Sequence, residues 1–98
     1  MIHGHVYILE CANGSYDVGS HRGDDPQRRA AEHNAGRNPR AYTFRRRPVE
    51  LVWSDYFSRY DDMVACERQI KGWSRAKKQA LIDGDVSLLK RLASRAGD

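Results

Sequence analysis

Two β-rich runs joined by an Asn-Gly pair constrain the fold of this chain more than any other feature. The first run covers residues 6–11 (VYILEC) and the second covers residues 16–20 (YDVGS), with Asn13-Gly14 between them. Asn-Gly between two such runs is the strongest short-range signal of a β-hairpin. A third β-type run covers residues 49–57 (VELVWSDYF). The chain is therefore predicted to build a small sheet from a hairpin and one later strand.

Helix signals follow the hairpin. Asp25 and Pro26 are typical of a helix start, because the carboxylate can cap the first turn and proline is tolerated at the first helical position. Gly36 is expected to end that helix. Residues 37–47 contain Pro39 and a run of arginines and are predicted to form a basic loop.

The last third of the chain is predicted to be helical. A second helix is expected to be capped by Asp61 or Asp62 and to end at Gly72, a third to cover residues 75–82, and a fourth to cover residues 86–93. The order β-β-α-β-α-α-α predicts an α/β (α+β) fold, with a small three-stranded antiparallel or mixed sheet flanked by helices.

Size and charge limit the possible functions. The 98 residues suggest one domain, predicted over residues 1–93, followed by a frayed tail at residues 94–98. A core this small favours an open cleft over an enclosed small-molecule pocket. The net charge is +4, and the excess is concentrated in residues 36–49 and 68–78, each with five basic residues and no acid. Such blocks attract phosphate, although a solvated basic surface explains them equally well.

The cysteines and the hydropathy pattern point to a cytoplasmic protein. Cys11 and Cys66 have no Cys-x-x-Cys spacing and are expected to be small core residues in a reducing compartment. No apolar run approaches the roughly 20 residues of a membrane span, and the N-terminus lacks the pattern of a signal peptide. No membrane partner is therefore expected.

Four separated segments carry side chains suited to phosphodiester chemistry. Residues 5–7 (HVY) begin the first strand, residues 17–20 (DVGS) end the second, residues 28–34 (RRAAEHN) lie on the first predicted helix, and residues 67–73 (ERQIKGW) lie on the second. In this order and spacing they resemble the GIY-YIG nuclease superfamily, and most closely its small stand-alone bacterial members. The resemblance implies the same sheet and helices, and a metal-dependent endonuclease that hydrolyses phosphodiester bonds of DNA.

Tyr7 matches the tyrosine of the first family motif. The resemblance implies that this tyrosine takes the proton of the attacking water or helps to orient that water. An unperturbed phenol has a pKa near 10, so Tyr7 needs a nearby cation to act as a base. A tyrosine in a strand is also commonly a half-buried packing residue.

The second family motif is altered in this chain. Relatives carry a tyrosine two positions before the glycine that corresponds to Gly19, and here that position is Asp17. Tyr16 is adjacent, but neighbouring residues of a strand point to opposite faces of the sheet. Three explanations stay open: a β-bulge brings Tyr16 round, Asp17 works in the cleft as a carboxylate, or activity is weakened.

Arg29 and His33 are four residues apart and are expected to share one helix face. By the family match Arg29 is the catalytic arginine, whose guanidinium can hold a phosphate bidentately and offset developing charge. His33 could touch the scissile phosphate or shuttle a proton, and a surface histidine is an equally good explanation. Arg28 points about 100° away and is expected to be exposed.

Glu67 matches the glutamate of the family helix. The resemblance implies that Glu67 is the only protein ligand of one divalent cation, Mg²⁺ or Mn²⁺. Mg²⁺ prefers oxygen ligands, keeps several waters and is commonly completed by substrate phosphates. The implied mechanism has a metal-polarised phosphate, charge neutralisation by Arg29 and in-line attack by a water near Tyr7. Glu67 lies beside a predicted apolar stripe of this helix, and most such glutamates are simply solvated. The stripe consists of residues spaced three, four and three apart, Met63, Cys66, Ile70 and Trp73.

Basic residues other than the assigned catalytic ones are predicted to contact the phosphates of DNA. Phosphate contacts of this kind give affinity without sequence information. Thr43 in the basic loop is a further candidate. The expected substrate is branched or single-stranded DNA, read with little sequence preference because the chain lacks a major-groove recognition helix. The predicted phosphate-contacting residues are Arg45, Arg46, Arg47, Lys71, Arg75, Lys77 and Lys78.

Two other functions fit the same residues. A nucleic-acid-binding module that has lost catalysis would keep the basic blocks and tolerate Asp17. A protein-interaction domain would use Trp53, Tyr56 and Phe57 of the third strand, provided that these aromatic side chains are exposed.

Overall fold

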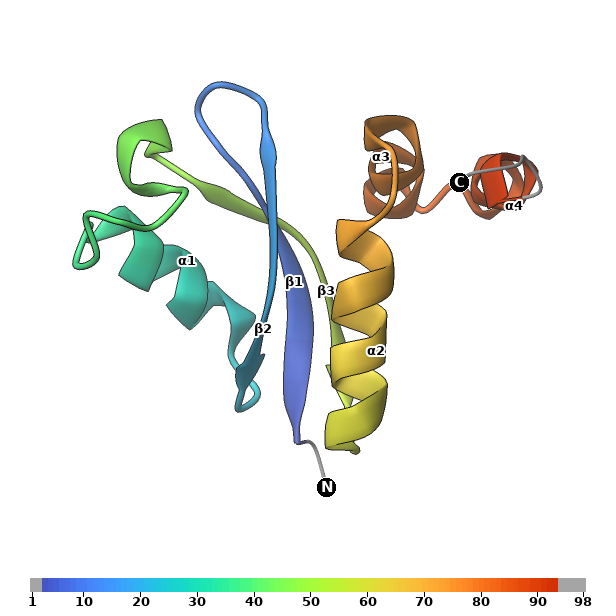
Figure 1. Cartoon of the computed structure of the whole chain (residues 1–98), viewed down its shortest axis with the longest axis horizontal. Coiled ribbons are helices and arrows are strands. Elements are labelled where there is room, and N and C mark those ends of the chain that lie inside the picture. Colours follow the sequence, from blue (N-terminus) through green and yellow to red (C-terminus); the bar gives the residue numbers. More distant parts are fainter. Residues whose placement is uncertain (1–2, 94–98) are drawn as a thin grey trace.

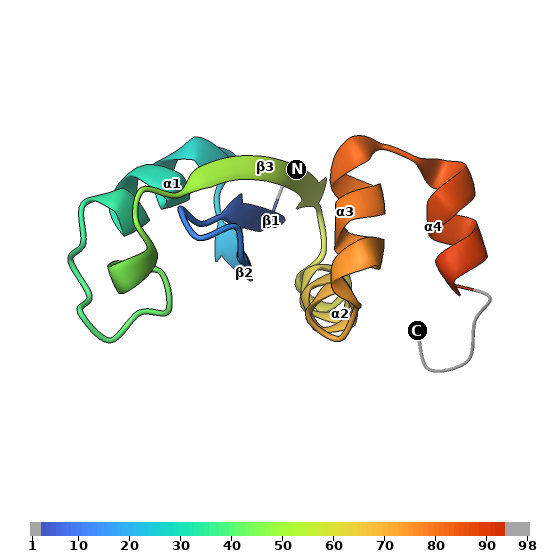
Figure 2. The same cartoon turned by 90° about the horizontal axis from the view of Figure 1, so that it is seen from above.

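The computed structural model describes residues 3–93, which form a three-layered arrangement with the sheet in the middle (Figure 1). Helix α1 covers one face of the sheet and helix α2 covers the other, as Figure 2 shows from above. The predicted element order and fold class are confirmed. The elements are β1 (Gly4–Glu10), β2 (Tyr16–Arg22), α1 (Pro26–Asn34), the 3₁₀ helix η1 (Phe44–Arg46), β3 (Glu50–Phe57), α2 (Tyr60–Lys71), α3 (Arg75–Asp83) and α4 (Val86–Ala93).

The sheet has the strand order β2-β1-β3, and both pairings are antiparallel. The predicted hairpin joins β1 to β2. Its turn is closed by a hydrogen bond of 2.9 Å from the Gly14 N–H to the Cys11 carbonyl, and Gly14 has φ +84°, a conformation that glycine adopts without steric cost. Strand β2 is longer than predicted. His21 and Arg22, which lie beyond the predicted run of residues 16–20, continue the pairing with β1 as far as Gly4.

Strand β1 lies at the centre of the sheet and is buried on both faces. Val6 and Ile8 belong to the hydrophobic cluster under α2, whereas Tyr7 and Leu9 belong to the cluster under α1. This split follows from the two-residue repeat of a strand, in which alternate side chains point to opposite faces.

The predicted apolar stripe of α2 is also confirmed. Met63 and Ile70 are buried in the cluster under α2, and Cys66 and Trp73 pack against it. Their spacing of three, four and three residues keeps them on one side of the helix. Cys66 and Cys11 are both free, as expected for packing residues.

Of the N-terminal caps predicted for α1 and α2, the first is confirmed and the second is wrong. Asp25 caps α1, where its carboxylate accepts a hydrogen bond of 3.1 Å from the Gln27 N–H. The prediction that Asp61 or Asp62 caps α2 is wrong. The N-cap residue is Arg59, which makes no side-chain capping bond. Both aspartates lie instead in the first helical turn, where a carboxylate is favoured by the helix dipole.

Helix α3 begins after Ser74, whose hydroxyl accepts a hydrogen bond of 3.2 Å from the Lys77 N–H. Helix α4 follows after Gly84 and packs along α3 on the side away from the sheet (Figures 1 and 2). The predicted C-terminal tail, residues 94–98, lies outside the described residues. The predicted extent of a single domain, residues 1–93, stays a prediction.

Candidate active site

The pairing of β1 with β2 decides which second-motif residue lies on the same face of the sheet as Tyr7. The register is regular along the whole pair, with Tyr7 opposite Gly19 and Leu9 opposite Asp17. Directly opposed residues of an antiparallel pair share a face of the sheet. Asp17 therefore lies on the same face as Tyr7, under α1, and Tyr16 lies on the other face.

Tyr16 has a structural role on that other face. Its hydroxyl donates a hydrogen bond to the Gln79 side chain of α3, and the Arg75 guanidinium lies 4.4 Å from its ring centroid. No bulge interrupts the β1–β2 pairing between Gly4 and Glu10. The possibility that Tyr16 is brought round to the Tyr7 face is therefore not realised.

Gly19 is required for the position of the Tyr7 phenol. A Cβ atom added at Gly19 would collide with the hydroxyl oxygen and the Cζ atom of Tyr7. The Tyr7 ring therefore passes directly over the backbone of β2, which is an edge strand of the sheet. Because glycine has no side chain, it allows the phenol hydroxyl to reach toward that edge.

Arg29 and His33 lie beside Tyr7 on the inner face of α1, as their spacing predicted. The Arg29 Cζ atom is 6.0 Å from the Tyr7 ring centroid, and the His33 ring centroid is 6.5 Å from it. Arg29 donates to Glu32 at 2.7 Å and lies within 3.4 Å of His33 Nε2. Its Nε atom is buried without a hydrogen-bond partner, and of the five guanidinium N–H groups these two contacts use at most two.

His33 is oriented by the loop that follows α1. Its Nδ1 atom lies 2.6 Å from the hydroxyl of Thr43. Thr43 is only 1% exposed, so the prediction that it reaches a phosphate directly is wrong. Its burial instead fixes the imidazole ring that faces Arg29.

Glu67 approaches the same edge strand from the opposite face of the sheet. Ser20 is paired with Val6 on the α2 side, and its hydroxyl donates a hydrogen bond to Glu67 Oε1. The other carboxylate oxygen, Oε2, forms an ion pair of 2.7 Å with Lys71 Nζ. The Glu67 side chain keeps 20% of its surface exposed. Both carboxylate oxygens thus have a partner within the protein, and the side chain remains partly exposed to solvent.

The carboxylates of the site differ in their electrostatics. Burial raises the pKa of Asp17 and the charge of Glu67 adds to this rise, whereas His33, Lys71 and Arg29 act to lower it. Burial alone would also raise the pKa of Glu67, but its hydrogen bonds with Lys71 and Ser20 outweigh burial and lower that pKa. Glu67 is therefore a stable carboxylate at neutral pH.

The two remaining titratable groups of the site favour their neutral forms. Burial raises the pKa of the Tyr7 phenol, and the Arg29 guanidinium only partly offsets this effect. Burial also lowers the pKa of His33, and the charge of Arg29 lowers it further. In this environment the phenol is a hydrogen-bond donor at neutral pH, and the imidazole is uncharged.

The basic residues predicted to contact phosphate occupy different environments. Arg45 is exposed on η1. Arg46 stacks on Tyr42 at 3.8 Å, and Arg47 lies 4.5 Å from the ring centroid of Phe44, so both also shape their own loop. These arginines and α3 lie on opposite sides of the β1–β2 hairpin (Figure 1).

Lys77 does not fit its predicted role. Its side chain is only 4% exposed, and its Nζ atom lies 4.6 Å from the Trp73 ring. A buried lysine on an aromatic ring packs its aliphatic stem in the core. Lys78 on the same helix is half-buried, whereas Arg75 is exposed and bonds to the hairpin turn at the Gly14 carbonyl, 2.7 Å away.

Comparison with known proteins agrees with this geometry. The family model described as the GIY-YIG catalytic domain matches residues 3–80. The chain belongs to the GIY-YIG family. The GIY-YIG family is a family of nucleases, whose substrates are nucleic acids.

Several relatives share most of the chain. A UPF0213 protein of Halobacterium salinarum is 44% identical over 77 residues, which cover 79% of this chain and 96% of the relative. A UPF0213 protein of Bacillus pumilus is 38% identical over 82 residues, covering 83% and 81% of the two chains. The solution NMR structure of UPF0213 protein BH0048 from Bacillus halodurans matches with a TM-score of 0.52 and 32% identity, covering 95% of this chain and 98% of that one.

The roles of two residues of the site were not predicted from the sequence. Ser20 was treated only as the end of a motif, and Lys71 only as a phosphate contact, yet both hold the Glu67 carboxylate. The spacing of Glu67 and Lys71, four residues along a helix, is a signal that could have identified this ion pair.

No helix within residues 3–93 is long and apolar enough to cross a membrane.

Proposed function

We propose that this protein is a metal-dependent endonuclease that hydrolyses phosphodiester bonds of DNA. The observation that carries the proposal is the convergence of Tyr7, Arg29 and Glu67 on edge strand β2, where Gly19 and Ser20 are consecutive. A phenol, a guanidinium and a carboxylate are the groups that metal-assisted phosphodiester cleavage requires.

Arg29 is proposed to bind the scissile phosphate. Its Nη1 and Nη2 atoms are held by Glu32 and His33, and each keeps a further N–H that these contacts do not use. A guanidinium fixed in this way can donate to a phosphate without reorganising, which stabilises charge that develops in the transition state. His33 would support Arg29 and lie close to the same phosphate.

Tyr7 is proposed to orient the attacking water. The raised pKa of the phenol argues against a phenolate base in the free protein. The hydroxyl reaches over Gly19 to the strand edge, where it can donate to or accept from one water molecule. Orientation of the nucleophile lowers the barrier because less entropy is lost in reaching the transition state.

Glu67 is proposed to hold the cation, Mg²⁺ or Mn²⁺. Its donor set fits such an ion, because it offers charged oxygen atoms, a lowered pKa and access to solvent. When bound, the cation would act as a Lewis acid on the phosphate. Asp17 adds a second carboxylate near this position, and Lys71 must release Oε2 for that oxygen to become a ligand.

The test is a cleavage assay on labelled single-stranded, duplex and branched DNA, with Mg²⁺, with Mn²⁺ and with a chelator. Wild type is expected to cut only with metal, Glu67→Ala to lose cutting while it keeps binding, and Tyr7→Phe to cut more slowly. Glu50→Ala is the matched control, since Glu50 is an exposed glutamate at the start of β3. Metal-independent cutting, or full activity of Glu67→Ala, would contradict the proposal.

A nucleic-acid-binding module without catalysis is the second candidate. It is favoured by Asp17, a carboxylate on the Tyr7 face of the sheet at the position where the family motif has a tyrosine. Metal-independent binding by wild type without cleavage of any substrate would support it. The protein-interaction alternative has less support, because Trp53 and Phe57 pack against the core and only Tyr56 is an exposed aromatic of the three.

A further inference from the structure

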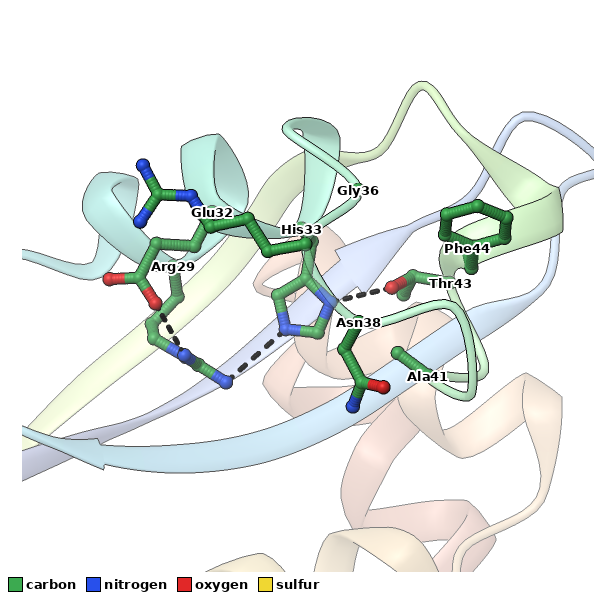
Figure 3. A pocket seen from close by; sticks show the side chains of 9 residues that line it. Arg29, Glu32, His33, Gly36, Asn38, Ala41, Thr43 and Phe44 are labelled. Atoms are coloured by element: carbon green, nitrogen blue, oxygen red, sulfur yellow. Dashed lines mark hydrogen bonds and ion pairs between the residues drawn. The ribbon is translucent and has the colours of Figure 1, made fainter.

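A hollow of ≈200 Å³ opens beside the Arg29 guanidinium. One side is formed by α1 and its end, and the other side is formed by the basic loop that follows (Figure 3). Arg29 and His33 belong both to this hollow and to the candidate active site. The remaining lining residues are Glu32, Gly36, Arg37, Asn38, Ala41, Thr43 and Phe44.

The far side of the hollow combines an amide with apolar surface. Asn38 points its side chain into the space between α1 and the loop, next to Ala41 (Figure 3). The Asn38 Oδ1 atom accepts a hydrogen bond of 3.1 Å from the Arg40 N–H, and the NH₂ end of the amide takes no part in that turn. Phe44 contributes aromatic surface to the lining, and the Arg47 guanidinium covers one face of its ring, 4.5 Å from the centroid.

This combination is the chemistry that recognises an unpaired nucleobase. Bases taken out of a helix are bound by stacking on aromatic rings and by hydrogen bonds to their exposed edges. Asparagine can donate and accept at once, which suits the mixed donors and acceptors of a base edge. The hollow's volume is that of about seven liquid waters, the scale of one planar base and too small for a base pair.

We propose that the hollow receives the base of an unpaired nucleotide next to the phosphate bound by Arg29, so that the substrate is DNA that is unpaired at the cleavage site. The proposal rests on the proposed function for the role of Arg29, and it adds the class of substrate. In a continuous duplex the neighbouring base is stacked and paired, and its entry would require the base to flip out of the helix.

The experiment compares two DNA duplexes that differ by one base. Each duplex carries a single unpaired nucleotide at a fixed position, and in one of them that nucleotide is abasic. Backbone and charge are the same, so the electrostatic contribution cancels. Binding is measured by fluorescence anisotropy with chelator present, which prevents metal-dependent cleavage. Wild type is expected to bind the base-containing duplex about tenfold tighter or more.

Variants locate this effect in the hollow. Asn38→Ala and Phe44→Ala are expected to reduce the ratio of the two affinities to about twofold or less, with little change in binding of the abasic duplex. Asn13→Ala, an exposed turn asparagine outside the hollow, is the matched control and should keep the wild-type ratio. If Phe44→Ala unfolds, Asn38→Ala decides the question, because Asn38 is an exposed loop residue.

The outcomes separate this inference from the proposed function. Equal affinities of wild type for the two duplexes, or an unchanged ratio in Asn38→Ala and Phe44→Ala, would overturn the base-binding hollow even if metal-dependent cutting is observed. A base-dependent ratio that disappears in the hollow variants would support it even if no substrate is cut, in which case only the nuclease proposal would fail.

Discussion

Replacement of Gly19 by alanine tests the close approach on which the candidate active site is built. The added Cβ would collide with the Tyr7 phenol, and Tyr7 is only 3% exposed, so its ring has little room to move aside. Overpacking of this kind typically costs about 1–3 kcal/mol of unfolding free energy. For a domain of this size, each kcal/mol lowers Tm by about 4–8 °C.

A double-mutant cycle measured by urea unfolding isolates the collision. In a Tyr7→Leu background the ring is absent, so Gly19→Ala should no longer be costly and should gain up to about 0.5–1 kcal/mol from the lower entropy of the unfolded chain. Gly72→Ala is the control, because its new Cβ would meet nothing closer than 3.6 Å. An equal loss from Gly19→Ala in both backgrounds would refute the steric reasoning.

Three further predictions follow from the contacts of the site. Lys71→Met should raise the affinity of Glu67 for Mn²⁺ about 1.4- to fivefold in an EPR titration, since a surface ion pair contributes about 0.2–1 kcal/mol; unchanged affinity would contradict a competing role for Lys71. The pKa of His33 is lowered by burial, so the unfolded state binds more protons and the free energy of unfolding should fall as pH drops below about 6.5. That fall should be shallower in His33→Asn, and an identical pH profile in urea unfolding would contradict it. Lys77→Ala should lower Tm with little effect on DNA binding, whereas Arg45→Ala should weaken binding and reduce its salt dependence without lowering Tm; the reverse pattern would contradict the burial argument.

Local sequence signals were sufficient for most of the architecture. The Asn13-Gly14 turn, the cap at Asp25 and the apolar stripe of α2 each depend on neighbours within a few residues, and each was predicted correctly. The cap of α2 was predicted wrongly, because the helix begins at Tyr60, before either aspartate, and two adjacent aspartates do not indicate where the first turn starts.

Charge patterns were less informative about the site. Lys77 and Arg45 belong to similar basic blocks, yet one is buried on Trp73 and the other is exposed. Thr43 lies in a loop rich in arginine and was expected to face phosphate, but it is buried against His33. Whether a polar residue faces solvent depends on which element packs over it, and the sequence of its own segment does not contain that information.

The sequence by itself determined the elements, the two faces of β1 and the spacing of Arg29 and His33, because these follow from the repeats of strands and helices. Only the tertiary structure decided that Asp17, and not Tyr16, shares a face with Tyr7, since this depends on an uninterrupted register between β1 and β2. It also decided that Tyr7 and Glu67, from opposite faces of the sheet, meet at one edge strand. Both side chains can reach β2 because α1 and α2 pack on opposite faces of the sheet and β2 is an edge strand. This arrangement brings together segments that are distant in the sequence, and no local sequence pattern encodes it.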